Sequence, residues 1–189
     1  RCSCRVRSAE RNRAGSRISC RARKISQAPG PTRRHPCAPM FIRVATPAEL
    51  IRVFMVRAIV FMEEQGISCR DEMDEHDDAS IHVLGEVCGE PVACGRIRFL
   101  GDRALLQRLA VRRAWRGQGH GSALLRFMLD ECRRNGFHRF TLRAQTQACH
   151  FYMRHGFSVC GQEFDEAGIP HLPMLLDETT GAGGPMQTE

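Results

Sequence analysis

The segment Leu109–Gly121 constrains this chain more than any other, because three closely spaced glycines join a strand-like run to an amphipathic helix. Gly117, Gly119 and Gly121 allow the backbone to turn sharply and leave its N–H groups uncovered. These donors, added to the positive end of the following helix, form a cradle for a pyrophosphate. Arg116 adds a fixed positive charge at the same turn. The segment therefore predicts a phosphate-binding turn.

Two common phosphate-binding patterns do not fit this turn. A P-loop requires Gly-Lys followed by Ser or Thr, and this segment lacks it. A Rossmann fold requires an acidic residue about 20 residues after the turn, at the end of a strand. Here Asp130 and Glu131 fall within a predicted helix. On spacing alone, an ordinary tight turn stays open as the alternative.

The apolar pattern predicts strands and helices that follow one another along the chain. Thr46, Pro47 and Glu49 form a helix start, with Thr as the N-cap and Glu completing a capping box. Short polar turns separate the three middle strands, which favours an antiparallel meander. We expect strands over 41–45, 81–87, 91–100, 104–111, 140–144, around Val159 and over 172–176, and helices over 46–62, 121–134 and 147–155. This order predicts an α/β fold with a mixed, mostly antiparallel sheet and flanking helices.

The positive charge of the chain is concentrated at its start. The net charge is +7, but residues 1–39 hold 11 Lys and Arg residues against one acid, Glu10. Because this segment has little apolar surface to bury, we expect a disordered basic extension that need not belong to the native product. A transit peptide and a nucleic-acid-binding arm are weaker alternatives. Residues 40–178 would then form the folded domain, with a flexible tail over 179–189.

The ten cysteines are expected to be reduced thiols. They are scattered and form no C-x-x-C pair, so neither a disulfide framework nor a zinc site is expected. Several occupy apolar positions of predicted elements, where Cys acts as a small buried hydrophobe. The acidic run 71–78 lacks the spacing of a calcium-binding EF-hand. No apolar run reaches the length of about 18 residues that a membrane helix needs. We therefore expect a cytoplasmic protein without a metal.

Leu109–Val111 followed by Arg116-x-x-Gly119-x-Gly121 resembles the acetyl-CoA loop of the GNAT N-acetyltransferase superfamily. A second mark lies downstream, where Ala148, Phe151-Tyr152 and Gly156-Phe157 resemble the helix that follows the family's fifth strand. Finer features resemble the ElaA/YjcF-like branch, and these are Val60-Phe61, Glu64-Gln65, Asp74, Asp77 and the segment 164–171. The resemblance covers residues 40–177, which is nearly all of the predicted domain.

The resemblance implies acetyl-CoA as the co-substrate, bound in a V-shaped split between the fourth and fifth strands. The backbone of Leu109, Ala110 and Val111 would pair with the pantetheine amides, and an N–H near Ala110 or Val111 would stabilise the oxyanion. The pyrophosphate would be held by Arg116, Gly117, Gln118, Gly119, His120 and Gly121. A primary amine would then attack the thioester directly in a ternary complex.

Two proton transfers have to be assigned. By the resemblance, Tyr152 occupies the acid position and could protonate the departing thiolate at a cost of about 2 kcal/mol; packing beside Phe151 is the alternative. Many relatives carry a Glu base on the fourth strand, but the equivalent here is Gln107, which accepts no proton. Glu64 is our first substitute for the base. The next candidates for the base are Glu75, Asp77 and His82. The alternative for each of these residues is an ordinary solvated or loop-ordering role.

The acceptor side is less defined by the sequence. The acidic run 71–78 would line the acceptor entrance and favour cationic amines, with Glu75 and Asp77 as substrate residues. His171 would face the same cleft, and a solvated charged loop is the alternative for the acidic run. The expected partner is a small-molecule or peptide amine, without nucleic acid or membrane, and a homodimer is compatible with the family. Transfer of a longer acyl group and a non-catalytic module that binds acyl-CoA are the alternative functions.

Overall fold

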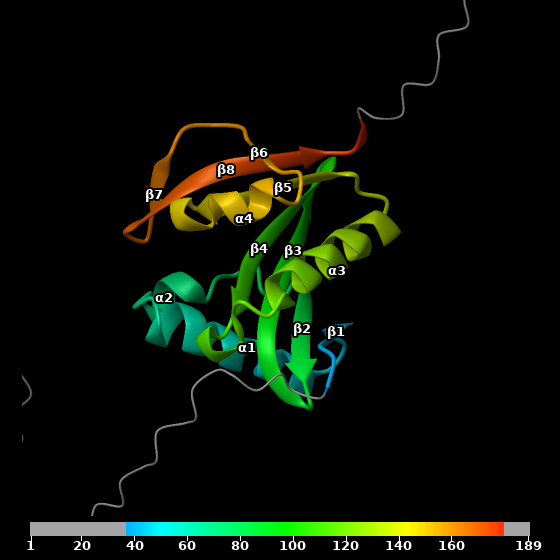
Figure 1. Cartoon of the computed structure of the whole chain (residues 1–189), viewed down its shortest axis with the longest axis vertical. Helices are drawn as coiled ribbons and strands as arrows, with labels where there is room; N and C mark the ends of the chain where they lie inside the picture. The colour runs from blue at the N-terminus through cyan, green and yellow to red at the C-terminus, as the bar shows by residue number, and fades with distance from the viewer. Residues whose placement is uncertain (1–36, 180–189) are drawn as a thin grey trace, which may run out of the picture. The chain divides into compact units, whose positions relative to one another are not determined.

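The computed structural model describes residues 37–179 and is built on one mixed sheet with helices on both faces (Figure 1). This arrangement confirms the expected fold class. The strands are β1 (Met40–Arg43), β2 (Ile81–Val87), β3 (Glu90–Leu100), β4 (Arg103–Val111), β5 (Arg139–Gln145), β6 (Ser158–Val159), β7 (Phe164–Glu166) and β8 (Ile169–Asp177). The helices are α1 (Pro47–Arg57), the π-helix η1 (Ala58–Glu63), α2 (Cys69–Glu72), the 3-10 turns η2 (Arg113–Trp115) and η3 (Thr146–Ala148), α3 (His120–Arg134) and α4 (Cys149–Met153).

The sheet divides where β4 meets β5. The strand order is β1-β2-β3-β4-β5-β8-β6, with β7 on β8, and only the β4–β5 pair is parallel. That pair holds together over Ala104–Leu106 and Phe140–Leu142 alone. Beyond it β4 continues to Val111 with β3 as its partner, while β5 stays paired to β8. The two strands therefore diverge (Figure 1), as the resemblance implies.

Alternate residues of the middle strands supply two separate cores. On β2, Val83 belongs to the core under α3, whereas Leu84 belongs to the core under α1 and η1. This alternation follows from the two-residue period of a strand. Helix α3, expected from the sequence as an amphipathic helix over 121–134, buries its apolar face, which consists of Leu124, Leu125, Met128, Leu129 and Cys132. The sheet is thus held between α3 on one face and α1 on the other.

Helix α1 begins as the sequence predicts and ends differently. The Thr46 hydroxyl accepts from the Glu49 N–H, and the Glu49 carboxylate accepts from the Thr46 N–H at 3.0 Å. The predicted helix to Met62 is α-helical only to Arg57, because the residues that follow, Ala58–Glu63, form the π-helix η1. A π-turn widens the helix and is common at functional sites. Here it leads directly into the loop that carries Glu64.

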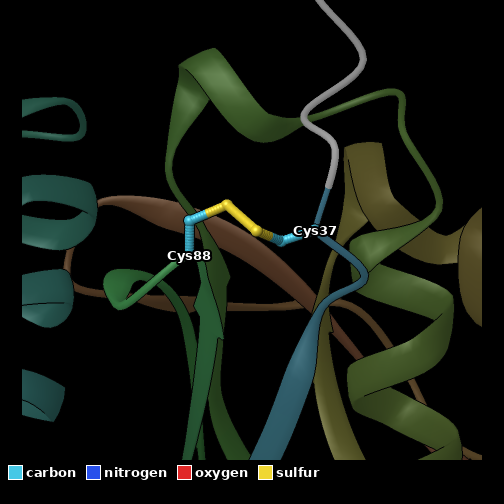
Figure 2. The surroundings of a disulfide bond; sticks show 2 residues. All are labelled: Cys37 and Cys88. Carbon is cyan, nitrogen blue, oxygen red and sulfur yellow. A yellow bond between two sulfur atoms is a disulfide. The ribbon is translucent and has the colours of Figure 1, made fainter.

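A disulfide joins Cys37 to Cys88 in the β2–β3 turn, across a sequence separation of 51 residues (Figure 2). The expectation that all cysteines are free thiols is therefore wrong for this pair, because a contact between segments so distant in sequence leaves no spacing signal. Cys94 and Cys132 are free and fully buried, and burial raises the pKa of both thiols to about 12. They act as buried hydrophobes, as expected.

Several predictions for the termini lie outside the described residues. These concern the basic extension up to residue 36, with Cys2, Cys4 and Cys20, and the tail from residue 180. Within residues 37–179, no helix is long and apolar enough to cross a membrane.

Candidate active site

The glycine-rich turn presents an open helix start. Gly117 and Gly119 take positive φ angles of 73° and 85°, in the left-handed region that favours glycine. Gly119 is the N-cap of α3, and no side chain caps that start. The first N–H groups of a helix lack partners within the helix, and the helix dipole adds partial positive charge there. The start of α3 is therefore suited to an anion such as pyrophosphate.

The Glu64 carboxylate binds the residues just before this turn. One Glu64 carboxylate oxygen accepts from the Arg113 N–H at 3.1 Å, and the other accepts from the Arg116 guanidinium. Arg116 also donates from Nε to the Val111 carbonyl at 2.8 Å. The Glu64 side chain is 13% exposed and lies among these donors. It is not among the residues that line the pocket described below.

A bulge in β4 turns consecutive side chains toward the divergence of the strands. The β3–β4 register shifts between Cys94 and Arg96, and Arg108 adopts a φ of +53°. A bulge breaks the usual alternation of faces, so Gln107, Arg108 and Leu109 all line the same pocket. A positive φ in a non-glycine residue is strained by about 1–3 kcal/mol. In this conformation Arg108 forms ion pairs with Glu72 and Asp74.

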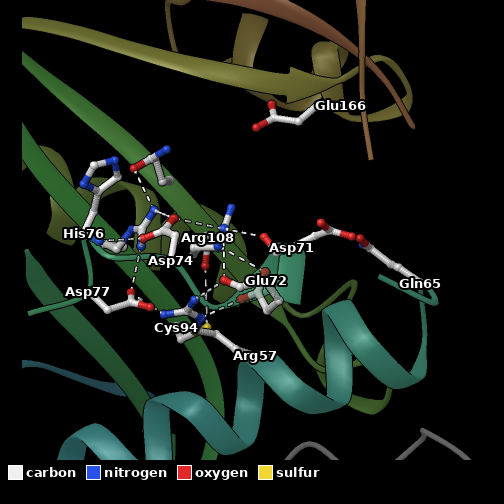
Figure 3. Close-up of polar contacts among 12 residues, drawn as sticks. Arg57, Gln65, Asp71, Glu72, Asp74, His76, Asp77, Cys94, Arg108 and Glu166 are labelled. Carbon is white, nitrogen blue, oxygen red and sulfur yellow. Dashed lines mark hydrogen bonds and ion pairs between the residues drawn. The ribbon is translucent and has the colours of Figure 1, made fainter. Parts of the chain in front are cut away.

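The pocket lies where β4 and β5 separate and has a volume of about 160 Å³. Its walls come from the region after α1, from β4 and β5, from α4 and from the β7–β8 hairpin. The lining residues are Phe61, Gln65, Ile67, Asp71, Glu72, Leu106, Gln107, Arg108, Leu109, Leu142, Arg143, Gln145, Ala148, Tyr152, Glu166, Ala167 and His171. In Figure 3, Glu166 faces Arg108, Asp71 and Gln65 from the opposite side.

Tyr152 borders this pocket with its ring held in the core. The ring lies 5.0 Å from that of Phe151 and 6.0 Å from that of Phe157, between centroids, and the residue is 9% exposed. Burial raises the pKa of Tyr152 to about 12. No hydrogen bond among residues 37–179 uses its hydroxyl. The phenol is therefore protonated at neutral pH and available as a proton donor.

His171 reaches the pocket from β8, opposite Gln145 of β5. Its Nδ1 donates to the Ile169 carbonyl at 2.8 Å. A neutral imidazole with a proton on Nδ1 has a lone pair on Nε2. The ring stacks on Phe164, with 5.9 Å between centroids. This contact and the hydrogen bond fix a potential proton acceptor at the pocket.

Three arginines pair with three acids of the run that precedes β2. Figure 3 labels two of these arginines, Arg57 and Arg108, beside the acids. Arg57 and Arg96 are almost fully buried. Arg57 donates to Glu72 and to Asp77, both at 2.6 Å. Arg96 donates to Asp77 at 2.7 Å and to both carboxylate oxygens of Asp74, at 2.6 and 2.7 Å. Three buried or half-buried carboxylates are thus paired and cannot attract a further cation strongly.

The third arginine closes this network at the pocket wall. Arg108 pairs with Glu72 at 3.1 Å and with Asp74 at 3.3 Å. Hydrogen bonds from Arg96 lower the pKa of Asp74. Burial raises the pKa of Glu72, although Arg108 and Arg57 oppose this effect. Burial also tends to raise the pKa of Asp77, but hydrogen bonds from Arg57 and Arg96 outweigh it and lower that pKa.

The residues expected at the acceptor side are therefore separated by the structure. His171 lines the pocket together with Tyr152, whereas Glu75 and Asp77 do not. Asp77 is committed to arginines, and Glu75 is exposed. His82 is buried, donates to the Asp77 carbonyl at 2.9 Å, and has its pKa lowered by burial.

The acidic run was expected at the acceptor entrance, and its members Asp71 and Glu72 line the pocket. Sequence reasoning gave no role to other polar wall residues, among them Gln65, Arg108, Arg143 and Glu166. One signal was present, because Arg57 interrupts an apolar helix and Arg96 interrupts an apolar strand. A buried arginine requires an acidic partner, and the acidic run supplies it.

Known proteins resemble this chain in sequence and in fold. The sequence model of the acetyltransferase (GNAT) domain matches residues 60–178. The chain is 36% identical over 130 residues to the uncharacterised N-acetyltransferase YjcF of Bacillus subtilis, covering 68% of this chain and 93% of that protein. It is also 36% identical over 138 residues to YyaT of Bacillus subtilis, covering 71% and 93%. The structure of Escherichia coli ElaA matches with a TM-score of 0.65 and 26% identity, covering 74% of this chain and 98% of ElaA. The chain therefore belongs to the GNAT acetyltransferase family, in the branch of YjcF and ElaA.

Proposed function

We propose that this protein transfers an acetyl group from acetyl-CoA to a primary amine by direct attack in a ternary complex. One observation carries the proposal. The pocket at the divergence of β4 from β5 is lined by a protonated Tyr152 and by His171, whose Nδ1 donates to the Ile169 carbonyl, and the same domain carries the open start of α3. A donor site, an acceptor pocket and two proton-transfer groups thus occur together.

The donor would lie along the free edge of β4. Leu109, Ala110 and Val111 follow the last β4–β5 pair, so their backbone groups on that side have no strand partner. The pantetheine amides would take that place, as a further strand would. The pyrophosphate would bind the N–H groups from Gly117 to Gly121, beside Arg116. Glu64 then acts as a positioning residue that orients Arg116, in place of the base role expected from sequence.

The chemistry requires one proton acceptor and one proton donor. An aliphatic amine has a pKa near 10, so only about one molecule in 1,000 is neutral at pH 7. His171 would remove that proton through Nε2. The neutral amine attacks the thioester carbon, and an N–H near Ala110 or Val111 stabilises the oxyanion. The C–S bond then breaks, Tyr152 protonates the departing thiolate, and the proton that the new amide nitrogen loses returns to the Tyr152 phenolate. Alignment of the two substrates supplies much of the rate.

One expectation from the sequence bears on where the protein works. A cytoplasmic location would hold Cys37 and Cys88 as thiols, whereas the structure joins them. The redox state of this pair in cells therefore tests the location.

Calorimetric titration of acetyl-CoA into the full chain tests the donor site. A Gly119→Glu variant places a bulky anion in the pyrophosphate cradle and should abolish binding. Gly136→Glu is the matched control, because Gly136 has a similar φ of 81°, open space around its Cβ position, and lies past the opposite end of α3. Binding by the parent and the control but not by Gly119→Glu supports the proposal. A folded parent that does not bind acetyl-CoA refutes it and leaves no enzyme function.

A further inference from the structure

Gln107 presents a hydrogen-bond donor to the pocket between β4 and β5, and a hydrogen bond from Arg96 fixes the orientation of its amide. Its Oε1 accepts from Arg96 Nη2 at 3.0 Å. A guanidinium has donors only, so the amide oxygen must face Arg96 and the amide NH₂ must face away. Arg96 is itself fully buried and held by Asp74 and Asp77. The amide therefore cannot turn over without losing this contact.

The NH₂ group of Gln107 is available to a bound molecule. Gln107 lines the pocket, and no hydrogen bond within residues 37–179 uses its Nε2. A donor beside a pocket favours a ligand that places an acceptor oxygen there, since an unpaired polar group in a closed complex costs free energy. A second ammonium at this point would face N–H groups and find no partner.

The charges of the pocket wall argue against a carboxylate as that acceptor. Three acidic side chains, Asp71, Glu72 and Glu166, line the pocket against two basic ones, Arg108 and Arg143. Both arginines already pair with acids, Arg108 with Glu72 and Arg143 with Glu166 at 3.2 Å. A ligand carboxylate would therefore meet a net negative wall, whereas an uncharged oxygen would not.

We propose that Gln107 selects acceptor amines that carry an uncharged oxygen acceptor, an amide carbonyl or a hydroxyl, a few bonds from the nitrogen. This inference rests on the proposed acetyl transfer and specifies the acceptor class for it. Amines with a second cation, or with a free carboxylate in that position, are the disfavoured class.

The test compares five small amines as acceptors for the full-length protein with acetyl-CoA. Glycinamide and ethanolamine carry an uncharged oxygen, propylamine carries none, ethylenediamine carries a second amine and glycine carries a carboxylate. The measured quantity is kcat/KM for each amine relative to propylamine. Because these amines differ in their own pKa, the decisive result is how each ratio changes between the parent and a variant, where that difference cancels.

Gln107→Met removes the donor and keeps the length of the side chain. The glycinamide ratio, the ethanolamine ratio or both should fall about fivefold, since one hydrogen bond contributes about 1 kcal/mol. Which ratio falls distinguishes the carbonyl from the hydroxyl. Gln107→Glu keeps an acceptor for Arg96 but exchanges the donor for a carboxylate, so the ethylenediamine ratio should rise. Gln162→Met is the control, because Gln162 is exposed and lies outside the pocket.

Specific outcomes overturn the inference. Glycinamide and ethanolamine ratios that stay within twofold of the parent in Gln107→Met would do so. An ethylenediamine ratio unchanged in Gln107→Glu would also do so. Each ratio compares two amines with the same protein sample, so a smaller folded fraction of a variant does not change it. A parent that binds acetyl-CoA but acetylates neither glycinamide nor ethanolamine overturns it too. A parent that does not bind acetyl-CoA refutes the proposed function instead.

Discussion

Replacing Tyr152 by phenylalanine removes one oxygen atom from the pocket and leaves the surrounding core intact. The ring packs against Phe151 and Phe157, and these contacts do not involve the hydroxyl. Since no hydrogen bond of the described residues uses that hydroxyl, the free energy of unfolding should change by less than about 0.5 kcal/mol. Any larger effect on turnover then reports on chemistry.

The size of the catalytic effect follows from the pKa of the phenol. With the pKa of Tyr152 raised to about 12 by burial, full transfer of its proton to a thiolate with a pKa near 8.5 is uphill by about 5 kcal/mol. This exceeds the roughly 2 kcal/mol expected from an ordinary tyrosine. The same burial raises the proton affinity of the departing thiolate, which lowers the barrier again. Proton donation in the transition state contributes about 100- to 10,000-fold.

The assay follows the loss of thioester absorbance, because Cys69 and Cys160 are exposed thiols that would react with a thiol reagent. Tyr152→Phe should lower kcat at least about 100-fold while calorimetry shows unchanged affinity for acetyl-CoA. A kcat within twofold of the parent would refute the acid role. A fall in parent activity near pH 9 that the variant abolishes would contradict the raised pKa of Tyr152 and not its role as the acid, because a phenol with a pKa of about 12 stays protonated at pH 9.

Three further predictions concern other parts of the molecule. His171→Gln should lower kcat/KM for the amine by about 100-fold at pH 7 without changing acetyl-CoA affinity; an unchanged rate would exclude His171 as the base. Arg96→Met should lower the free energy of unfolding in urea by about 3 kcal/mol, because it removes the buried partner of Asp74 and one of the two buried partners of Asp77. Arg103→Met, at an exposed position, should change it by less than about 0.5 kcal/mol, and equal effects would contradict the network. Cys88→Ser, or a reductant, should lower the free energy of unfolding by up to about 4 kcal/mol, because the bond to Cys37 closes a long loop and so lowers the entropy of the unfolded chain. A melting temperature that neither change lowers would show that the bond adds no stability.

Features that depend on neighbouring residues could be predicted from the sequence. The capping box at Thr46, the buried stripe of α3 and the turn at Gly119 each follow from residue types within a few positions. Strand β2 matches its expected bounds for the same reason, since polar turns delimit an apolar run. These local signals were sufficient to specify the fold class and the glycine-rich turn before α3.

Features that depend on distant contacts could not be predicted. The six-residue π-helix, the short strand β7 and the Cys37–Cys88 bond are decided by packing between segments far apart in the chain. Glu64 illustrates the difficulty, because its position in the sequence suggested a base near the acceptor. Only the folded chain brings Glu64 against Arg116, and this contact is the basis for proposing a positioning role for it.

The acidic run shows how pairing changes the meaning of a charge pattern. From the sequence, its carboxylates would attract a cationic amine. In the structure, Arg57, Arg96 and Arg108 neutralise Glu72, Asp74 and Asp77, so these carboxylates hold α2 and its loop against the sheet. The same contacts fix Arg96, and Arg96 in turn orients the amide of Gln107. If selectivity for the acceptor amine depends on that amide, then the acidic run acts on the substrate indirectly. It holds Arg96, and Arg96 determines that the NH₂ group of Gln107, and not its oxygen, faces the pocket.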